Sequence, residues 1–222
     1  MTIKNGTVVL IAVAGLATAA GADVVSSTFD GGDDGWLVAD GNSPANESGT
    51  SQPEYMVSGG NEGGFITTVI NWSGPAFFVA PAAYLGDQSD MVGGSIVVDR
   101  RFVRPDSQAD TLQVDYEVDL TITDSSNSMT LAVDLSPVPL DSWESFEVTL
   151  GVAGGWFILG TGVAASEAEI AAVLGDLGDV RVRGNIRDTF GRVAIDNFGL
   201  VPTPGTLAVL GFAGLAAARR RR

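Results

Sequence analysis

The chain contains no cysteine and no histidine. Without cysteine it has no disulfide framework and no thiolate chemistry, so its stability must come from packing or from a bound ion. Without histidine it has neither a Ser-His-Asp nor a Cys-His triad, and it lacks both the usual zinc ligand and the most common general base. Any catalysis is therefore restricted to carboxylates.

Positive charge is also scarce, with 12 Lys and Arg against 27 Asp and Glu. Lys4 and Arg219–Arg222 lie in the terminal segments, which contain no acidic residue, so residues 23–200 carry a net charge of 7 − 27 = −20. This charge keeps a protein soluble and disfavours nucleic acid and anionic membranes as partners. It suits divalent cations, whose preferred ligands are carboxylate and carbonyl oxygens.

The first 22 residues have the layout of a secretory signal. Lys4 precedes an uncharged, largely apolar run from Val8 to Ala20, and small residues stand at Ala20 and Ala22. A positive start, an apolar stretch and an A-x-A site predict export with cleavage after Ala22. Residues 1–22 are therefore expected to be absent from the mature protein.

The C-terminal segment, residues 201–222, combines an apolar stretch with a terminal cluster of arginines. Thr206–Ala218 carries no charge, and as a helix of about 1.5 Å per residue it spans roughly 20 Å, less than the roughly 30 Å of a bilayer core. The arginines that follow favour the cytoplasmic side of a membrane. The pattern predicts a transient stop in the inner membrane rather than a permanent anchor.

This segment resembles the PEP-CTERM sorting signal of Gram-negative bacteria. The resemblance implies an exosortase-type membrane enzyme as partner, removal of the tail, and delivery to the cell envelope, the cell surface or the extracellular matrix. Thr203 departs from the family pattern, because the commonest form has glutamate there. The residues that carry the resemblance are Val201, Pro202, Thr203, Pro204, Gly205, Arg219, Arg220, Arg221 and Arg222.

Between the two tails the chain reads as short strands separated by Gly, Asp and Ser. In "TLQVDYEVDLTIT", apolar residues from Leu112 to Ile122 alternate with polar ones, which indicates a half-buried antiparallel strand. Asp124–Asn127 is a turn that predicts a hairpin with "SMTLAVDL". "ESFEVTL" and "GSIVVDRRFV" are further expected strands.

One segment, Ser166–Leu177, has the pattern of a helix. Ser166 and Glu169 have capping-box spacing, and apolar residues follow at i, i+3, i+4 and i+7 from Ile170. Strands with a single short helix predict a mostly β protein, a two-sheet sandwich whose helix covers one end of the sheets.

Two glycine- and aspartate-rich motifs leave alternatives open. "GGNEGGF", Gly59–Phe65, is either a nest of backbone N–H groups that binds an anion or, as we favour, a hairpin turn. In "AIDNF", Asp196 interrupts an apolar strand, and a buried carboxylate needs a partner. That partner is calcium, the backbone, or one of the arginines 181, 183 and 192.

Aromatic and acidic residues raise two further possibilities. The chain has four tryptophans, Trp36, Trp72, Trp143 and Trp156. Together with Phe77 and Phe78 they suggest stacking on sugars, although most tryptophans in a sandwich belong to the core or its rim. The many carboxylates permit glycoside hydrolysis by an acid–base pair. No pair stands in an apolar setting that would raise a pKa, so the sequence does not favour an enzyme.

The landmarks of residues 23–200 resemble the laminin IV type A (laminin B) module. They are "FDGGDDGW", "GGNEGGFI", "FFVAPAAYLGD", "GGSIVVDRRF", "VLGDLGDVRVRGNI" and "VAIDNFGL". The resemblance implies a jelly-roll sandwich with an adhesive or matrix-building role rather than catalysis, and a structural calcium at Asp30 and Asp196. Laminin modules sit amid cysteine-rich repeats, so assembly into laminin-like rods is not implied.

The sequence thus predicts an exported, non-enzymatic surface or matrix module that binds exopolysaccharide or surface glycans. The alternative is a carbohydrate-active enzyme that uses paired carboxylates. Incubation of the mature domain with polysaccharides distinguishes the two, because only the enzyme turns its ligand over.

We expect the native mature protein to lack both tails. Intact-mass analysis should give a chain that starts near Asp23 and ends near Val201–Gly205, because the signal and the sorting motif are both removed. A species that retains Arg219–Arg222 would refute the sorting hypothesis.

Overall fold

The computed structural model describes residues 24–69, 76–103, 118–137, 141–185 and 192–203. The predicted signal peptide, Trp72, most of the C-terminal tail and the first part of the long alternating strand lie outside these residues.

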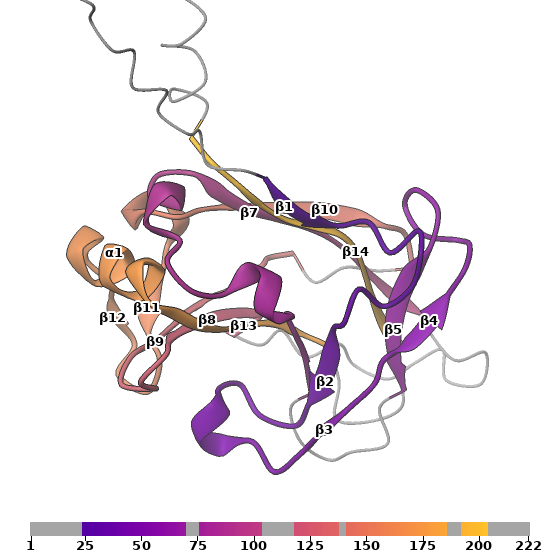
Figure 1. Ribbon diagram of the computed structural model, residues 1–222, viewed down its shortest axis with the longest axis horizontal. Helices are drawn as coiled ribbons and strands as arrows, with labels where there is room; N and C mark the ends of the chain where they lie inside the picture. The colour runs from indigo at the N-terminus through magenta and orange to yellow at the C-terminus, as the bar shows by residue number, and fades with distance from the viewer. Residues whose placement is uncertain (1–23, 70–75, 104–117, 138–140, 186–191, 204–222) are drawn as a thin grey trace, which may run out of the picture.

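The described chain folds into two antiparallel sheets that pack face to face (Figure 1). Sheet A has the order β10-β7-β14-β5-β4. Strand β1 pairs with the C-terminal part of β14, on the same edge that β5 pairs with earlier in the strand. Sheet B has the order β12-β11-β9-β8-β13-β6-β2-β3. Sheet A comprises β1 (Val25–Ser27), β4 (Glu54–Met56), β5 (Phe65–Val69), β7 (Ser95–Val103), β10 (Glu144–Thr149) and β14 (Arg192–Val201). Sheet B comprises β2 (Leu37–Ala39), β3 (Thr50–Ser51), β6 (Phe77–Val79), β8 (Leu120–Asp124), β9 (Thr130–Val133), β11 (Phe157–Ile158), β12 (Val163–Ala164) and β13 (Leu177–Arg183).

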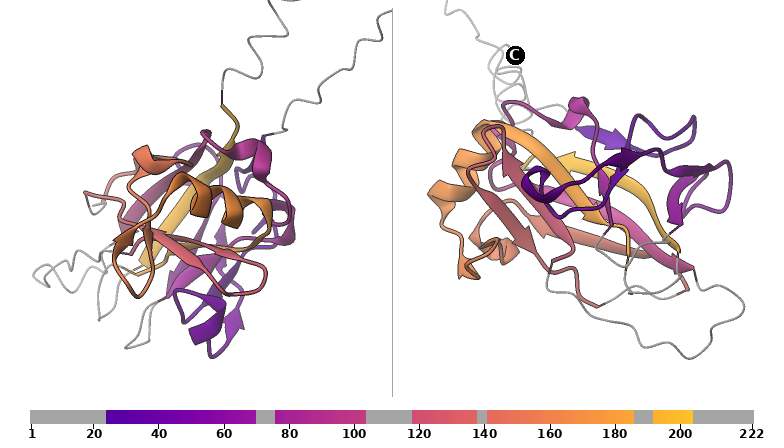
Figure 2. Two further views of the ribbon diagram at one scale, coloured as in Figure 1. Left: turned by 90° about the vertical axis from the view of Figure 1, so that its left-hand side faces the viewer. Right: turned by 90° about the horizontal axis from the view of Figure 1, so that it is seen from below.

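This arrangement is the predicted jelly-roll sandwich. The expected strands around residues 95–103, 130–133 and 144–149 are present, and the turn after Asp124 joins β8 to β9 in a hairpin. Short 3-10 turns occupy Pro44–Asn46 (η1), Ala82–Tyr84 (η2), Ser89–Met91 (η3) and Val152–Gly154 (η4). Figure 2 shows the two layers from the side and from below.

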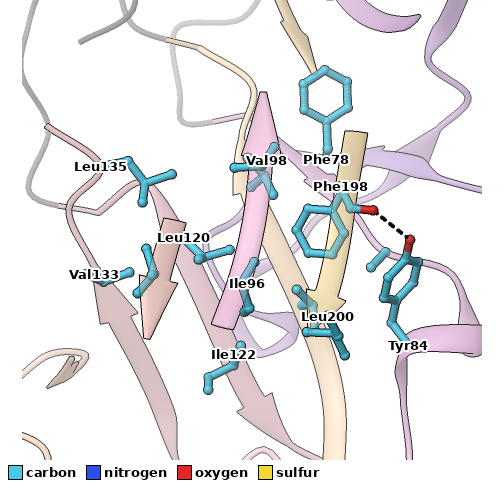
Figure 3. Packing of buried hydrophobic residues seen from close by; sticks show 14 of the residues in the cluster. Phe78, Tyr84, Ile96, Val98, Leu120, Ile122, Val133, Leu135, Phe198 and Leu200 are labelled. Carbon is cyan, nitrogen blue, oxygen red and sulfur yellow. Dashed lines mark hydrogen bonds between the residues drawn. The ribbon is translucent and has the colours of Figure 1, made fainter. Parts of the chain in front are cut away.

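The core lies between the two sheets because alternate side chains of each strand point inward (Figure 3). Ile96 and Val98 of β7 meet Leu120 of β8 across the gap. Trp36 and Tyr84 both form hydrogen bonds to Ser27 Oγ, at 3.1 and 2.9 Å, so the buried aromatic groups have polar partners. Burial raises the pKa of Tyr84 to about 12.

The outer face of sheet B is more buried than the sequence predicts. Thr121 and Thr123 point away from the core, as the alternation requires, yet both are fully buried. Thr121 donates a hydrogen bond to the carbonyl of Asn42 in the loop after β2, and Thr123 shares a hydrogen bond of 3.0 Å with Thr130 of β9. The expectation of a half-buried strand is therefore wrong for β8, because a polar face can be covered by a loop as well as by water.

Strand β14 contains a β-bulge that changes its partner. Its register with β7 shifts between Asp196 and Gly199, and Asn197 has a positive φ of 48°, a conformation that Asn tolerates better than most residues. Before the bulge, β14 pairs with β5; after it, the same edge pairs with β1. Asp196 therefore sits in the gap between two neighbouring strands.

The predicted helix is confirmed as α1 (Glu167–Gly175), which lies against β8 and β9. Ser166 Oγ accepts the N–H of Glu169 at 3.3 Å, and Glu169 accepts the N–H of Ser166 at 2.8 Å, which completes the capping box. Ile170, Val173 and Leu174 are buried. The helix ends before Leu177, which begins β13.

Loss of the cap should weaken the fold without destroying it. We expect Ser166→Ala to lower the free energy of unfolding by about 1 kcal/mol, because an N–H at the helix start loses its acceptor. Urea denaturation measures this change, with Ser26→Ala, an exposed serine of β1, as the control. An unchanged midpoint would show that the cap does not stabilise the domain.

Candidate binding site

The carboxylate of Asp196 fills the gap at the bulge and is fully buried. Its Oδ2 accepts the backbone N–H groups of Asn61 at 2.8 Å and Glu62 at 3.3 Å, and its Oδ1 accepts the N–H of Asn197 at 2.7 Å. Burial raises the pKa of Asp196, and the three N–H donors oppose this shift without cancelling it. The backbone is therefore a partner of this buried carboxylate.

The loop Gly59–Gly64 satisfies both interpretations of its sequence. It joins the paired strands β4 and β5, so it is a hairpin connection, and it also aims two backbone N–H groups at an anion. That anion is the chain's own Asp196. A Cβ on Gly60 would collide with Asp196 Oδ2 and with the carbonyl of Gly64, so this contact requires glycine.

Asp30 borders the same loop at a different point. It is exposed, accepts a hydrogen bond from Thr28 Oγ1 at 3.0 Å, and lies where a Cβ on Gly63 would collide with it. The described residues contain no group of three acidic side chains placed to hold a metal ion. Because three N–H donors already satisfy Asp196, the observed contacts favour the backbone role, and calcium at Asp30 and Asp196 stays a prediction.

Two of the arginines suggested as partners for Asp196 are engaged elsewhere. Arg181 is buried on the outer face of sheet B and pairs with Asp179 at 2.7 Å and Glu47 at 2.6 Å. Arg183 donates to the carbonyl of Val118 at 2.5 Å. The side chain of the third, residue 192, lies outside the described part of the chain.

Trp143 lies beside the loop, on the outer face of sheet A, and is half-buried. Its Nε1 donates to the carbonyl of Gly59 at 3.1 Å. The guanidinium of Arg101 lies 4.7 Å from its ring, and the ring of Phe65 meets it edge-on at 5.5 Å. These contacts fix the orientation of the indole. We call Trp143, Arg101 and Phe65 the Trp143 platform.

The polar neighbours of the platform are also held in place. Asp99 Oδ2 accepts the side-chain amides of Asn61 and Asn197, each at 2.8 Å. Ser145, opposite Asp99 in the register of β10, is exposed. Burial lowers the pKa of Arg101, and the guanidinium group of arginine is always charged in proteins. The platform thus presents an aromatic ring, a cation and fixed polar groups on one rigid sheet.

A cleft of about 680 Å³ lies at the other end of β10, a volume within the range of small-ligand sites. Phe157 lines it and is half-buried, whereas Trp156, which also lines it, is buried. The cleft also contains Asp134, which accepts a hydrogen bond from Ser136 at 2.8 Å. Its described lining is Val133, Asp134, Val152, Gly154, Gly155, Trp156, Phe157, Gly162, Ala164 and Ala165.

The tryptophan prediction is confirmed for the core and refined at the surface. Trp36 and Trp156 are buried, as are Phe77 and Phe78, whereas Trp143 reaches solvent. The sequence did not single out Phe157 or Asp134. The signal that was available is the glycine-rich stretch on either side of "WFIL", because such a composition suits turns that bound a hollow.

Part of the predicted sorting motif lies among the described residues. Val201 ends β14, and Thr203 donates a hydrogen bond to the carbonyl of Val92 at 3.3 Å. Pro204, Gly205 and Arg219–Arg222 lie outside the described residues. In the described part of the chain, no helix is long and apolar enough to span a membrane.

Comparison with solved structures supports the jelly-roll class. The L4b domain of human laminin α2 superposes with a TM-score of 0.61 at 9% identity, over 81% of this chain and 98% of that one. A family 11 carbohydrate-binding module of the cellulosomal cellulase Lic26A-Cel5E of Clostridium thermocellum gives 0.42 at 13% identity, over 82% and 87%. An exo-β-agarase gives 0.46 at 15% identity, over 69% and 22%. Because the last two scores are below 0.5, nothing about this chain follows from them.

The family follows from the sequence match. The model of the family Laminin B (Domain IV) matches residues 77–204, which is more than half of the chain. The chain therefore belongs to the Laminin B (Domain IV) family. A search of curated proteins finds no match.

Replacement of Asp196 should destabilise the domain, and the same experiment tests whether calcium binds there. We expect Asp196→Ala to lower the free energy of unfolding by about 2–4 kcal/mol, because three N–H groups lose their buried acceptor. Thermal melting with and without chelator measures this, and the loss should persist in chelator. A chelator that lowers the melting temperature of the wild type but not of Asp196→Ala would assign calcium to the site. A variant as stable as the wild type would contradict both roles.

Proposed function

We propose that this protein is an exported, non-catalytic module that binds carbohydrate at the cell surface or in the extracellular matrix. Membership of the Laminin B (Domain IV) family supports a binding role outside the cell. The observation that carries the proposal is the cleft beside β11, because it combines an aromatic surface with a single carboxylate.

The lining of the cleft suits a sugar. Small-ligand sites are mostly apolar and aromatic, with a few polar groups that set orientation. A pyranose ring offers C–H groups on one face and hydroxyl groups around its edge. Phe157 supplies the apolar contact, and Asp134 supplies an acceptor for hydroxyl groups, since a carboxylate accepts in several directions.

The same lining argues against hydrolysis. Glycosidases generally place two carboxyl groups on either side of the bond to be cleaved. Among the described residues, Asp134 is the one carboxylate that lines the cleft. The carboxyl groups whose pKa is raised by burial, Asp179 and Asp196, lie beneath the loop over sheet B and at the bulge of β14. Neither faces the cleft, so no acid–base pair is assembled there.

Location and processing are proposed from the terminal segments. The signal-like N-terminus supports export, and the PEP-CTERM-like tail supports recognition by an exosortase-type enzyme with transient contact at the inner membrane. The proposed destination is the envelope, the surface or the matrix of a Gram-negative bacterium. The ligands in that setting are exopolysaccharide or surface glycans.

Removal of the aromatic surface should weaken binding strongly without unfolding the domain. We expect Phe157→Ala to weaken binding to a polysaccharide identified by panel screening by about tenfold or more, since buried aromatic anchors dominate binding energy. Asp134→Asn should weaken binding less, because the amide keeps one acceptor. Affinity electrophoresis measures both variants.

Leu37→Ala is the matched control, because Leu37 is an exposed apolar residue of β2 outside the cleft lining. Binding by Phe157→Ala equal to that of the control would refute the cleft. Release of reducing ends by the wild type would favour the carbohydrate-active enzyme instead.

A further inference from the structure

We infer that the protein has a second glycan site, the Trp143 platform, and that its two sites allow one molecule to cross-link two polysaccharide chains. The inference rests on the proposed carbohydrate binding at the cleft and adds a function to it, the formation of a network. The observation behind it is a half-buried tryptophan, held in place by its contacts, at the end of β10 opposite the cleft.

The platform is organised before any ligand arrives. The indole of Trp143 is held by its hydrogen bond to Gly59, by the guanidinium of Arg101 and by the edge of Phe65. A ring that is already ordered loses little conformational entropy on binding, so more of its contact energy appears as affinity. Nothing in the packing of the core requires this indole, because the buried cluster between the sheets does not include it.

The surroundings of the ring supply hydrogen-bonding groups for a sugar. Asn61 and Ser145 are exposed, and Asp99 is fixed by its two amide partners. Arg101 brings a cation beside the ring, although its Nε is buried and has no hydrogen-bond partner among the described residues. A ring beside a guanidinium, an amide and a hydroxyl is the chemistry that recognises a hydroxyl-rich, uncharged glycan. An anionic glycan would meet the net negative charge of the whole chain.

The two sites are too far apart to be one. Trp143 immediately precedes β10, and the cleft residue Val152 follows its other end. A strand of six residues at about 3.3 Å per residue is about 20 Å long. Figure 1 shows β10 between the end of the molecule that carries β4 and β5 and the end that carries β11, β12 and α1. The platform lies on the outer face of sheet A, whereas strands of sheet B line the cleft.

Two separate sites on one rigid domain change what binding does. A protein with one site coats a polysaccharide, whereas a protein with two joins neighbouring chains and gains avidity wherever both sites are occupied. Joining requires no catalysis and no disulfide, which agrees with a chain that has no cysteine. A small domain can therefore hold a matrix together as a monomer.

The experiment counts sites and then measures networks. Calorimetry with a neutral oligosaccharide from the polysaccharide bound by the wild type, too short to span 20 Å, should give two sites per chain. Trp143→Ala and Phe157→Ala should each give one. Light scattering with the polymer should rise to a maximum at an intermediate protein ratio for the wild type and stay low for either variant. Leu37→Ala should behave as the wild type.

A second variant distinguishes loss of the Trp143 site from misfolding of the domain. Ser145→Arg leaves Trp143 in place and puts a bulky group on the exposed face beside it, so it should also remove one site while the melting temperature is unchanged. One site in the wild type, or full networking by both Trp143→Ala and Ser145→Arg, would overturn the inference. If that single site is lost in Phe157→Ala, the proposed function stands and only the second site fails. If the wild type binds no polysaccharide, both fail.

Discussion

The hydrogen bonds from the Gly59–Gly64 loop to the carboxylate of Asp196 close the gap in sheet A. Strand β14 needs a partner along its whole edge, yet β5 pairs with it only as far as Ile195 and β1 only from Phe198. The two residues between them would leave backbone and a carboxylate unsatisfied. The loop supplies N–H groups to Asp196, and Asn61 and Asn197 together hold Asp99. The β-bulge of β14 thus holds the Gly59–Gly64 loop in place through Asp196.

That anchor extends to the proposed second site. The loop that binds Asp196 through Asn61 and Glu62 also presents the carbonyl of Gly59 to Trp143. The bulge therefore positions the aromatic platform through backbone contacts. Removal of Asp196 should disturb the platform as well as stability, whereas removal of Trp143 leaves the buried carboxylate satisfied. The order of dependence runs from the bulge to the loop and from the loop to the surface.

The elements that local pattern determines were the ones that sequence reasoning predicted. Alternation predicts the strands around residues 95–103, 130–133 and 144–149, and the capping box predicts α1 with its N-cap at Ser166. The sequence does not decide between the alternatives for Asp196, because it does not show which distant loop faces this residue. The full burial of Thr121 was missed for the same reason, since its cover comes from Asn42, about 80 residues earlier. Asp134 and Phe157 share a cleft only because β9 and β11 pair.

The charge of the chain bears on how such a domain would work in a matrix. Residues 23–200 carry a net charge of −20, and the full chain −15, so copies repel one another and association of the protein with itself is disfavoured. A matrix built by this protein would then be held together through glycans rather than through contacts between protein surfaces. The two proposed glycan sites at opposite ends of β10 would meet that requirement, because each copy would remain apart from its neighbours while the polymer connects them. On this proposal, the acidity of the domain and the separation of the two sites serve the same end.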